Sequence, residues 1–205
     1  MKNVYQLKPT NVDNETGSIK FGGGTCIEGA WPKNPLGEEL TLLFSIETNV
    51  LNKLISSLGL PPNYTVSIFS TYNESRYFID DIVFTGDDVE FNYICKGYTR
   101  ITIGNKDSYK EGGVRVSEKK LTLSQRNLEN TDFPAFSFIS NDIPNGLVGY
   151  EKLMKEYIFI GQLYSSDLSS ENNGILGLSD SIGYMFLKKK IEDNNDIGFF
   201  FIQTA

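Results

Sequence analysis

The sequence carries five carboxylates within eleven positions, namely Asp80, Asp81, Asp87, Asp88 and Glu90. Paired carboxylates can bind Mg²⁺ or Ca²⁺, or serve as the general acid and base of a hydrolase. Their spacing does not match an EF-hand loop. Because adjacent residues of a strand point to opposite faces, the first two could not share an ion on a regular strand. The stretch is also explained by a solvated hairpin, or by an acidic patch that binds a basic protein.

The absence of histidine from the sequence restricts the chemistry further. It excludes Ser-His-Asp and Cys-His catalysis and every zinc or iron site that needs a histidine ligand. Asp180 and Ser181 are adjacent in a predicted turn, but no base is present that could activate the serine. We therefore predict a protein that is not an enzyme and has no cofactor and no metal site.

The charge balance constrains the class of partner. The formal net charge is −7 and the isoelectric point is about 4.7. Nucleic acids and anionic membranes attract basic surfaces, so neither is an expected partner, whereas a basic protein is compatible with this charge. Met1–Tyr5 lacks the apolar stretch of a signal peptide, and Cys26 and Cys95 form no metal-spaced pair, which predicts a reducing cytoplasm.

The stretch Phe21–Phe44 is expected to be the structural signature around which the chain is organised. Its glycine triplet, Gly22–Gly24, allows positive φ and close approach of backbones. We interpret it as a backbone crossing rather than a phosphate loop, since the lysine and hydroxyl residue of a P-loop do not follow. Trp31 is predicted to pack against a strand at Leu40–Ile46, although a tryptophan can also serve as a ligand platform.

The apolar pattern predicts a sheet with few helices. A helix capped by Thr48 or Asn49 should run to Leu58, because apolar residues there recur at helical spacing. Alternating segments rich in aromatic and β-branched residues predict strands. In the first half these are Leu40–Ile46, Tyr64–Ser70, Tyr77–Phe84, Val89–Cys95 and Tyr98–Ile103.

The last fifty residues repeat the strand pattern of the first half. The matched segments are Tyr157–Leu163 with Leu42–Ile46, Ile182–Leu187 with Tyr64–Phe69, and Gly198–Ile202 with Ile79–Phe84. The same order and similar spacing indicate an internal duplication. We predict one sheet-rich α+β domain over residues 1–205, with a few short helices and two similar halves at about 17–104 and 133–205.

Several of these residues resemble a known family. Phe21-Gly22-Gly23, Trp31-Pro32, Gly37 and Leu40, followed by a strand, a helix and a strand, resemble the YwqG-like family of bacterial domains of unknown function. In the second half Gly161-Gln162-Leu163 and Leu178–Tyr184 look similar to the repeat of that scheme, whereas Ser45 or Ile46 stands where the family often has its first glutamine. The resemblance implies a duplicated, sheet-rich fold. It brings no known activity, although some members are similar to, or encoded near, immunity proteins of bacterial toxin systems.

Two functions are compatible with these observations. The first is a cytoplasmic binding protein, in its sharpest form an immunity protein that neutralises a basic toxin or effector through the acidic surface of residues 80–90. The alternative is a small-ligand-binding protein or a carboxylate-dependent enzyme with a pocket between the two halves. That alternative requires two or more of Asp80, Asp81, Asp87, Asp88 and Asp180 to converge in a cleft.

Overall fold

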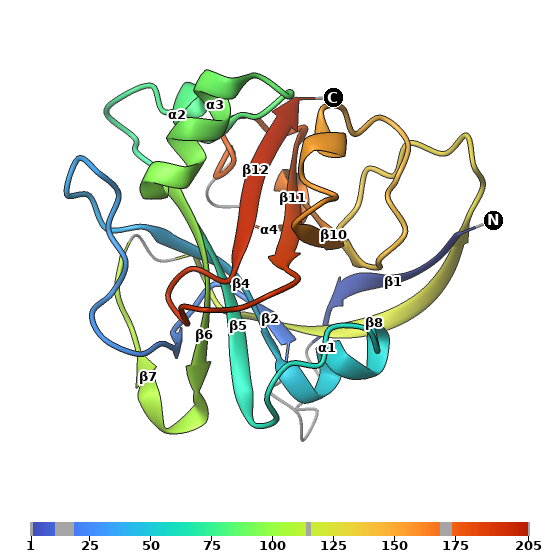
Figure 1. Cartoon of the computed structure of the whole chain (residues 1–205), viewed down its shortest axis with the longest axis horizontal. Coiled ribbons are helices and arrows are strands. Elements are labelled where there is room, and N and C mark those ends of the chain that lie inside the picture. The colour runs from blue at the N-terminus through green and yellow to red at the C-terminus, as the bar shows by residue number, and fades with distance from the viewer. Residues whose placement is uncertain (1, 11–18, 114–115, 169–173, 205) are drawn as a thin grey trace.

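The computed structural model describes residues 2–10, 19–113, 116–168 and 174–204. Within them, ten strands form one antiparallel sheet in the order β12-β11-β10-β9-β1-β8-β2-β4-β5-β6 (Figure 1). Its two outermost strands lie against each other, so the sheet is nearly closed. The described residues form four short α-helices, and the predicted sheet-rich α+β domain is confirmed.

The strands of this sheet are β1 (Lys2–Pro9), β2 (Ile19–Phe21), β4 (Thr41–Glu47), β5 (Tyr64–Ser70), β6 (Thr99–Asn105), β8 (Lys119–Leu128), β9 (Phe138–Ile139), β10 (Tyr157–Tyr164), β11 (Ser181–Lys188) and β12 (Gly198–Thr204). A separate two-stranded sheet pairs β3 (Thr25–Cys26) with β7 (Tyr109–Lys110). The helices are α1 (Thr48–Leu54), α2 (Ile79–Ile82), α3 (Asp88–Tyr93) and α4 (Ser165–Leu168), and single helical turns are η1 (Ile94–Tyr98), η2 (Lys106–Ser108) and η3 (Tyr150–Lys152). No helix in the described part of the chain has the length and apolar character needed to cross a lipid bilayer.

The sheet has the same arrangement of strands when it is followed from either edge. β12, β11 and β10 at one edge correspond to β6, β5 and β4 at the other. Both β4 and β10 carry a bulge, at Leu43 and at Ile160, and each strand leads directly into a short helix. The chain then takes the same number of residues to pass from Leu42 to its partner Phe69 as from Phe159 to its partner Phe186. The two halves thus share the position of a bulge and the length of chain between paired strands. The repeat is therefore present in the backbone as well as in the sequence.

The third pair of repeated strands differs from the prediction. Gly198–Ile202 corresponds to β6 and not to Ile79–Phe84, which holds α2. The predicted strand Val89–Cys95 is also wrong, because α3 and η1 occupy it. In Ile79–Val83 the apolar residues lie at positions i, i+3 and i+4, a pattern that fits one helical turn as well as it fits a short strand. The predicted helix after Thr48 is present but ends at Leu54, one turn earlier than expected.

The first strand of each repeat lies in the other half of the sheet. Along the chain β1 precedes β2 and β8 precedes β9, yet β1 pairs with β9 and β8 pairs with β2. The two exchanged strands pair with each other at the centre, from Lys2 with Leu128 to Pro9 with Leu121. The predicted limits of the halves, 17–104 and 133–205, leave out both of these strands, and residue 17 lies outside the described residues.

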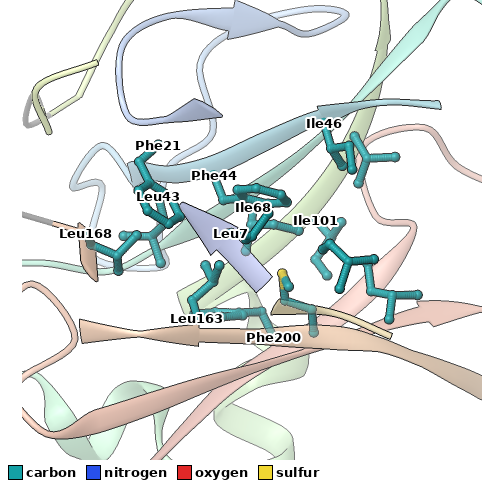
Figure 2. Close-up of a cluster of buried hydrophobic side chains, with 14 of the residues drawn as sticks. Leu7, Phe21, Leu43, Phe44, Ile46, Ile68, Ile101, Leu163, Leu168 and Phe200 are labelled. Atoms are coloured by element: carbon teal, nitrogen blue, oxygen red, sulfur yellow. The ribbon is translucent and has the colours of Figure 1, made fainter. Parts of the chain in front are cut away.

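The main core fills the space between the two halves. Figure 2 shows Phe21, Leu43 and Phe44 from the first half facing Leu163 and Phe200 from the second half. All five side chains are fully buried. Each buried side chain of this size contributes about 2 kcal/mol to folding through the area that it removes from water. The halves are therefore held together by a continuous apolar layer.

The outer faces of the sheet are covered by long connections. Over the first half, the ring of Trp31 packs edge-on against Phe69 at 5.2 Å, and its Nε1 donates a hydrogen bond to the Leu40 carbonyl oxygen at 2.7 Å. Trp31 also packs against the cluster that contains Leu40 and Leu42, which confirms its predicted packing. Over the second half, Phe84 packs against the rings of Phe199 and Phe201 at 5.6 and 5.1 Å. The segment that follows α2 therefore crosses from the first half to cover the second.

The glycine triplet is a backbone crossing, as expected. Gly22 has φ +56°, and a Cβ atom there would lie 2.2 Å from the carbonyl oxygen of Val116. Only glycine fits such a contact without moving the backbone. The triplet thus lets the segment before β8 pass directly over the end of β2.

Candidate partner-binding surface

All five predicted carboxylates lie in one connection between neighbouring strands. Residues 71–98, here named the insertion, lead from β5 to β6 and form α2, α3 and η1, whereas the corresponding connection from β11 to β12 is only residues 189–197. In Figure 1 α2 and α3 lie at the end of the molecule where β12 ends. The two halves thus differ in the length of this connection, and the longer one carries the acidic residues.

The two carboxylates of α2 have different surroundings. Asp81 accepts a hydrogen bond from Nη1 of Arg76 at 2.5 Å, and Arg76 also bonds both carboxylate oxygens of Glu38 at 2.8 and 3.2 Å. These bonds from Arg76 lower the pKa of Glu38 from 4.5 to about 2, and they fasten the insertion to the loop before β4. Asp80 is exposed beside Tyr77, where desolvation and the neighbouring carboxylate raise the pKa of the tyrosine hydroxyl.

The three carboxylates of α3 shape the start of that helix. Asp87 caps it by accepting hydrogen bonds from two backbone N–H groups of the first turn, at 2.7 and 3.3 Å. Glu90 accepts from the backbone and the hydroxyl of Thr85 at 2.6 and 3.0 Å. Asp88 forms an ion pair with Lys152 at 2.7 Å, although 88% of its side chain is exposed. Asp87 and Asp88 therefore both lie on the surface, the first as the cap of α3 and the second as the partner of Lys152.

Exposed apolar and aromatic side chains accompany the carboxylates. Tyr77 is 68% exposed, Val89 is 64% exposed and Tyr93 is 37% exposed. Sequence analysis did not single out these residues, because exposure of a tyrosine cannot be read from a segment wrongly predicted as a strand. Tyrosines next to carboxylates are suited to contacting lysine and arginine side chains, through their rings and through charge.

The carboxylates do not gather in one of the four cavities described for this chain. None of the five lines such a cavity, and Asp180 lines a cavity against β10 and β11 of the second half. Over the described ranges, no three or more Asp, Glu or Cys side chains are arranged to hold a metal ion. The insertion thus offers an exposed surface for contact with another molecule.

Two cavities occupy equivalent positions on the outer faces of the two halves. The first-half cavity has a volume of about 240 Å³ and is lined by Ser45, Glu47 and Thr65 of β4 and β5. Lys106 also lines it and forms an ion pair with Glu47 at 2.9 Å. The one carboxylate that described residues contribute to this cavity is therefore already paired with a lysine, and a second lysine, Lys20, adds positive charge to the lining.

The second-half cavity has a volume of about 140 Å³ and is lined at the equivalent strand positions by Gln162, Tyr164 and Ile182. Gln162 is fully buried, and its Nε2 donates hydrogen bonds to the carbonyl oxygens of Pro134 and Phe136 at 2.6 and 2.9 Å. Its Oε1 has no hydrogen-bond partner. The sequence signal for this site is a polar glutamine within the apolar strand β10.

Neither the protein-family models nor the curated proteins compared with the chain gave a match.

Proposed function

We propose that this chain is a non-enzymatic binding protein that recognises a basic protein partner through the insertion. In its sharpest form it is an immunity protein, which would neutralise a toxin or effector by covering that protein's active site. The contact surface consists of the exposed aromatic and apolar residues Tyr77, Val89 and Tyr93 and the surrounding carboxylates Asp80, Asp81, Asp87, Asp88 and Glu90.

One observation supports this proposal above the others. The two halves share their strand order, bulges and connection lengths, but the insertion has only a short counterpart in the second half. A segment of this length is not needed to join two antiparallel neighbours, since β11 and β12 are joined without it. Its exposed tyrosines and carboxylates are therefore more simply explained by binding than by the folding of the sheet.

The charge of the surface accounts for how such a complex would form. A net charge of −7 raises the rate at which a basic protein encounters the molecule. Exposed tyrosines then supply large contact areas that lose little side-chain entropy, and they are frequent among the residues that dominate binding energy. A partner held in this way would have its own basic cleft blocked, which is the simplest form of toxin neutralisation.

Two further parts of the proposal concern compartment and relationship. The cysteines Cys26 and Cys95 are both free, which is compatible with a reducing cytoplasm. Membership of the YwqG-like family stays a proposal that rests on the Phe-Gly-Gly, Trp-Pro and Gly-Gln-Leu residues of this sequence.

The test is binding to the products of neighbouring genes that encode candidate toxins. We expect one of them to co-purify with this chain and to lose toxicity in cells that produce it. Tyr77→Ala should weaken the complex by about 30-fold, the loss typical of a dominant interface residue. Tyr109→Ala is the matched control, because Tyr109 is also exposed (53%) but lies on β7, outside the insertion.

A second pair of variants tests whether the charge of the insertion, rather than the net charge of the chain, speeds association with the partner. Asp80→Asn with Asp88→Asn should reduce the association rate and its dependence on salt. Asp142→Asn with Glu192→Gln removes the same charge outside the insertion and should leave the rate nearly unchanged. The proposal is wrong if no candidate binds and no cell is protected, or if the control pair slows association as much as the test pair.

A further inference from the structure

The second-half cavity combines aromatic walls with one carboxylate. Phe133, Tyr164 and Tyr184 contribute rings to its lining, and Asp180 contributes the only formal charge among the described residues that line it. Tyr184 is 4% exposed, and burial raises the pKa of its hydroxyl to about 12, so this ring adds no charge near neutral pH. The cavity therefore favours a ligand that is neutral or positively charged.

The size of the cavity limits the ligand to one side chain. Sites for drug-sized molecules usually have volumes of roughly 300 to 1,000 Å³, and this cavity, at about 140 Å³, is smaller. Phe133 is 73% exposed at its edge, where it can cover the aliphatic part of an entering chain. The cavity is thus suited to the end of a long side chain rather than to a nucleotide or a sugar.

The unpaired oxygen of Gln162 indicates which functional group the ligand must carry. A buried polar atom without a partner is unfavourable, and a ligand that donates a hydrogen bond to it removes that cost. The amide nitrogen of the same side chain is already bound to two carbonyl oxygens, so the orientation of Oε1 is fixed. A donor that also stacks on aromatic rings and pairs with a carboxylate meets all the requirements of this cavity.

We propose that the second-half cavity binds the guanidinium group of an arginine side chain presented by a polypeptide. Arginine has five N–H donors in one plane, stacks on aromatic rings and pairs with carboxylates, whereas lysine is a compact charge that does not stack. The guanidinium stacks on the aromatic lining of the cavity, donates to Oε1 of Gln162 and pairs with Asp180. This site does not depend on the proposed function of the insertion, because it shares none of its residues.

The equivalent cavity of the first half lacks these properties. Ser45 stands at the position of Gln162, and Lys20 and Lys106 contribute positive charge to the lining. The ion pair between Lys106 and Glu47 occupies the carboxylate that a guanidinium would need. The first-half cavity therefore serves as an internal control for binding at the second-half cavity.

The test is titration of the full chain with N-acetyl-arginine N-methylamide, followed by NMR. We expect a dissociation constant of about 1 mM or lower, as for a small ligand with few contacts. Signals of Ile182 should shift, and those of Thr65, at the equivalent position of the other cavity, should not. The matched citrulline compound has the same shape without the charge and should bind about tenfold more weakly; the lysine compound should also bind more weakly.

Variants test the carboxylate and the exposed ring at the edge of the cavity. Asp180→Asn and Phe133→Ala change exposed residues and should each weaken arginine binding by about fivefold without unfolding the protein. Asp142→Asn removes an exposed carboxylate that does not line the cavity and should leave binding unchanged. The proposal is overturned if the wild-type chain shows no binding at concentrations of the arginine compound up to about 20 times the expected dissociation constant. It is also overturned if citrulline binds equally well, or if Asp142→Asn weakens binding as much as Asp180→Asn.

Discussion

The charge state of Glu38 is tied to the native structure. It accepts hydrogen bonds from Arg76, Asn34 and Asn73, and its pKa falls from 4.5 to about 2, chiefly because of Arg76. A lowered pKa means that the carboxylate stabilises the folded state above pH 4.5. That contribution is lost as the pH falls from 4.5 towards 2.

Glu38→Gln should therefore lower the free energy of unfolding by about 1 to 2 kcal/mol at pH 7, allowing for partial screening of a side chain that is 28% exposed. Urea unfolding at pH 7 and at pH 2 measures the effect, and the difference from the wild-type chain should nearly vanish at the lower pH. The control is Glu192→Gln, which breaks an ion pair with 85% and 73% exposed side chains and should not change stability measurably. A loss that is equal at both pH values would contradict the assigned role of the charge.

At the scale of the element, Asp87 has both a helix-capping role and a place on the candidate surface. Its side chain accepts two backbone N–H bonds at the start of α3. Asparagine caps a helix about as well as aspartate, whereas alanine cannot accept these bonds and costs about 1 kcal/mol. We expect Asp87→Ala to lower the melting temperature and Asp87→Asn to leave it nearly unchanged, as measured by circular dichroism. If both variants melt alike, the capping bonds do not stabilise the helix.

The elements also show which parts of this fold a sequence can predict. The long apolar strands β4, β10 and β11 have enough residues to reveal their pattern, and the duplication followed from them. The helices α2 and α3 are only four and six residues long, so their apolar spacing does not distinguish a helix from a strand. The acidic residues of the insertion could be found from their density, but their helical arrangement could not.

The second-half cavity marks a different limit of sequence analysis. Gln162 stands out as a polar residue in an apolar strand, and Gln203 stands out in the same way in β12. Both line the cavity, but its wall also needs Phe133 and Asn145 from distant parts of the chain. Tertiary contacts of this kind have no local signal, so the sequence could point to unusual residues without locating the cavity.

At the scale of the whole molecule, the exchanged first strands make each half incomplete without the other. A chain divided between Gly112 and Gly113, after β7, gives one fragment with β1 to β7 and another with β8 to β12. Each fragment lacks a strand that its sheet requires and exposes half of the core that fills the space between the halves. We expect neither fragment to fold alone and an equal mixture to restore one cooperative unfolding transition, as followed by circular dichroism and size-exclusion chromatography. Cooperative unfolding of either isolated fragment would show that the halves are independent.

The exchange also sets the order in which the protein can fold as it leaves the ribosome. β1 is made first, but its partners β8 and β9 emerge only after more than half of the 205 residues have been synthesised. Until then the nascent chain exposes an unpaired strand, and such edges can pair with other chains. Contacts between residues so far apart in sequence also slow folding. The native sheet can therefore be completed only late in translation or after release, once β8 and β9 have been synthesised.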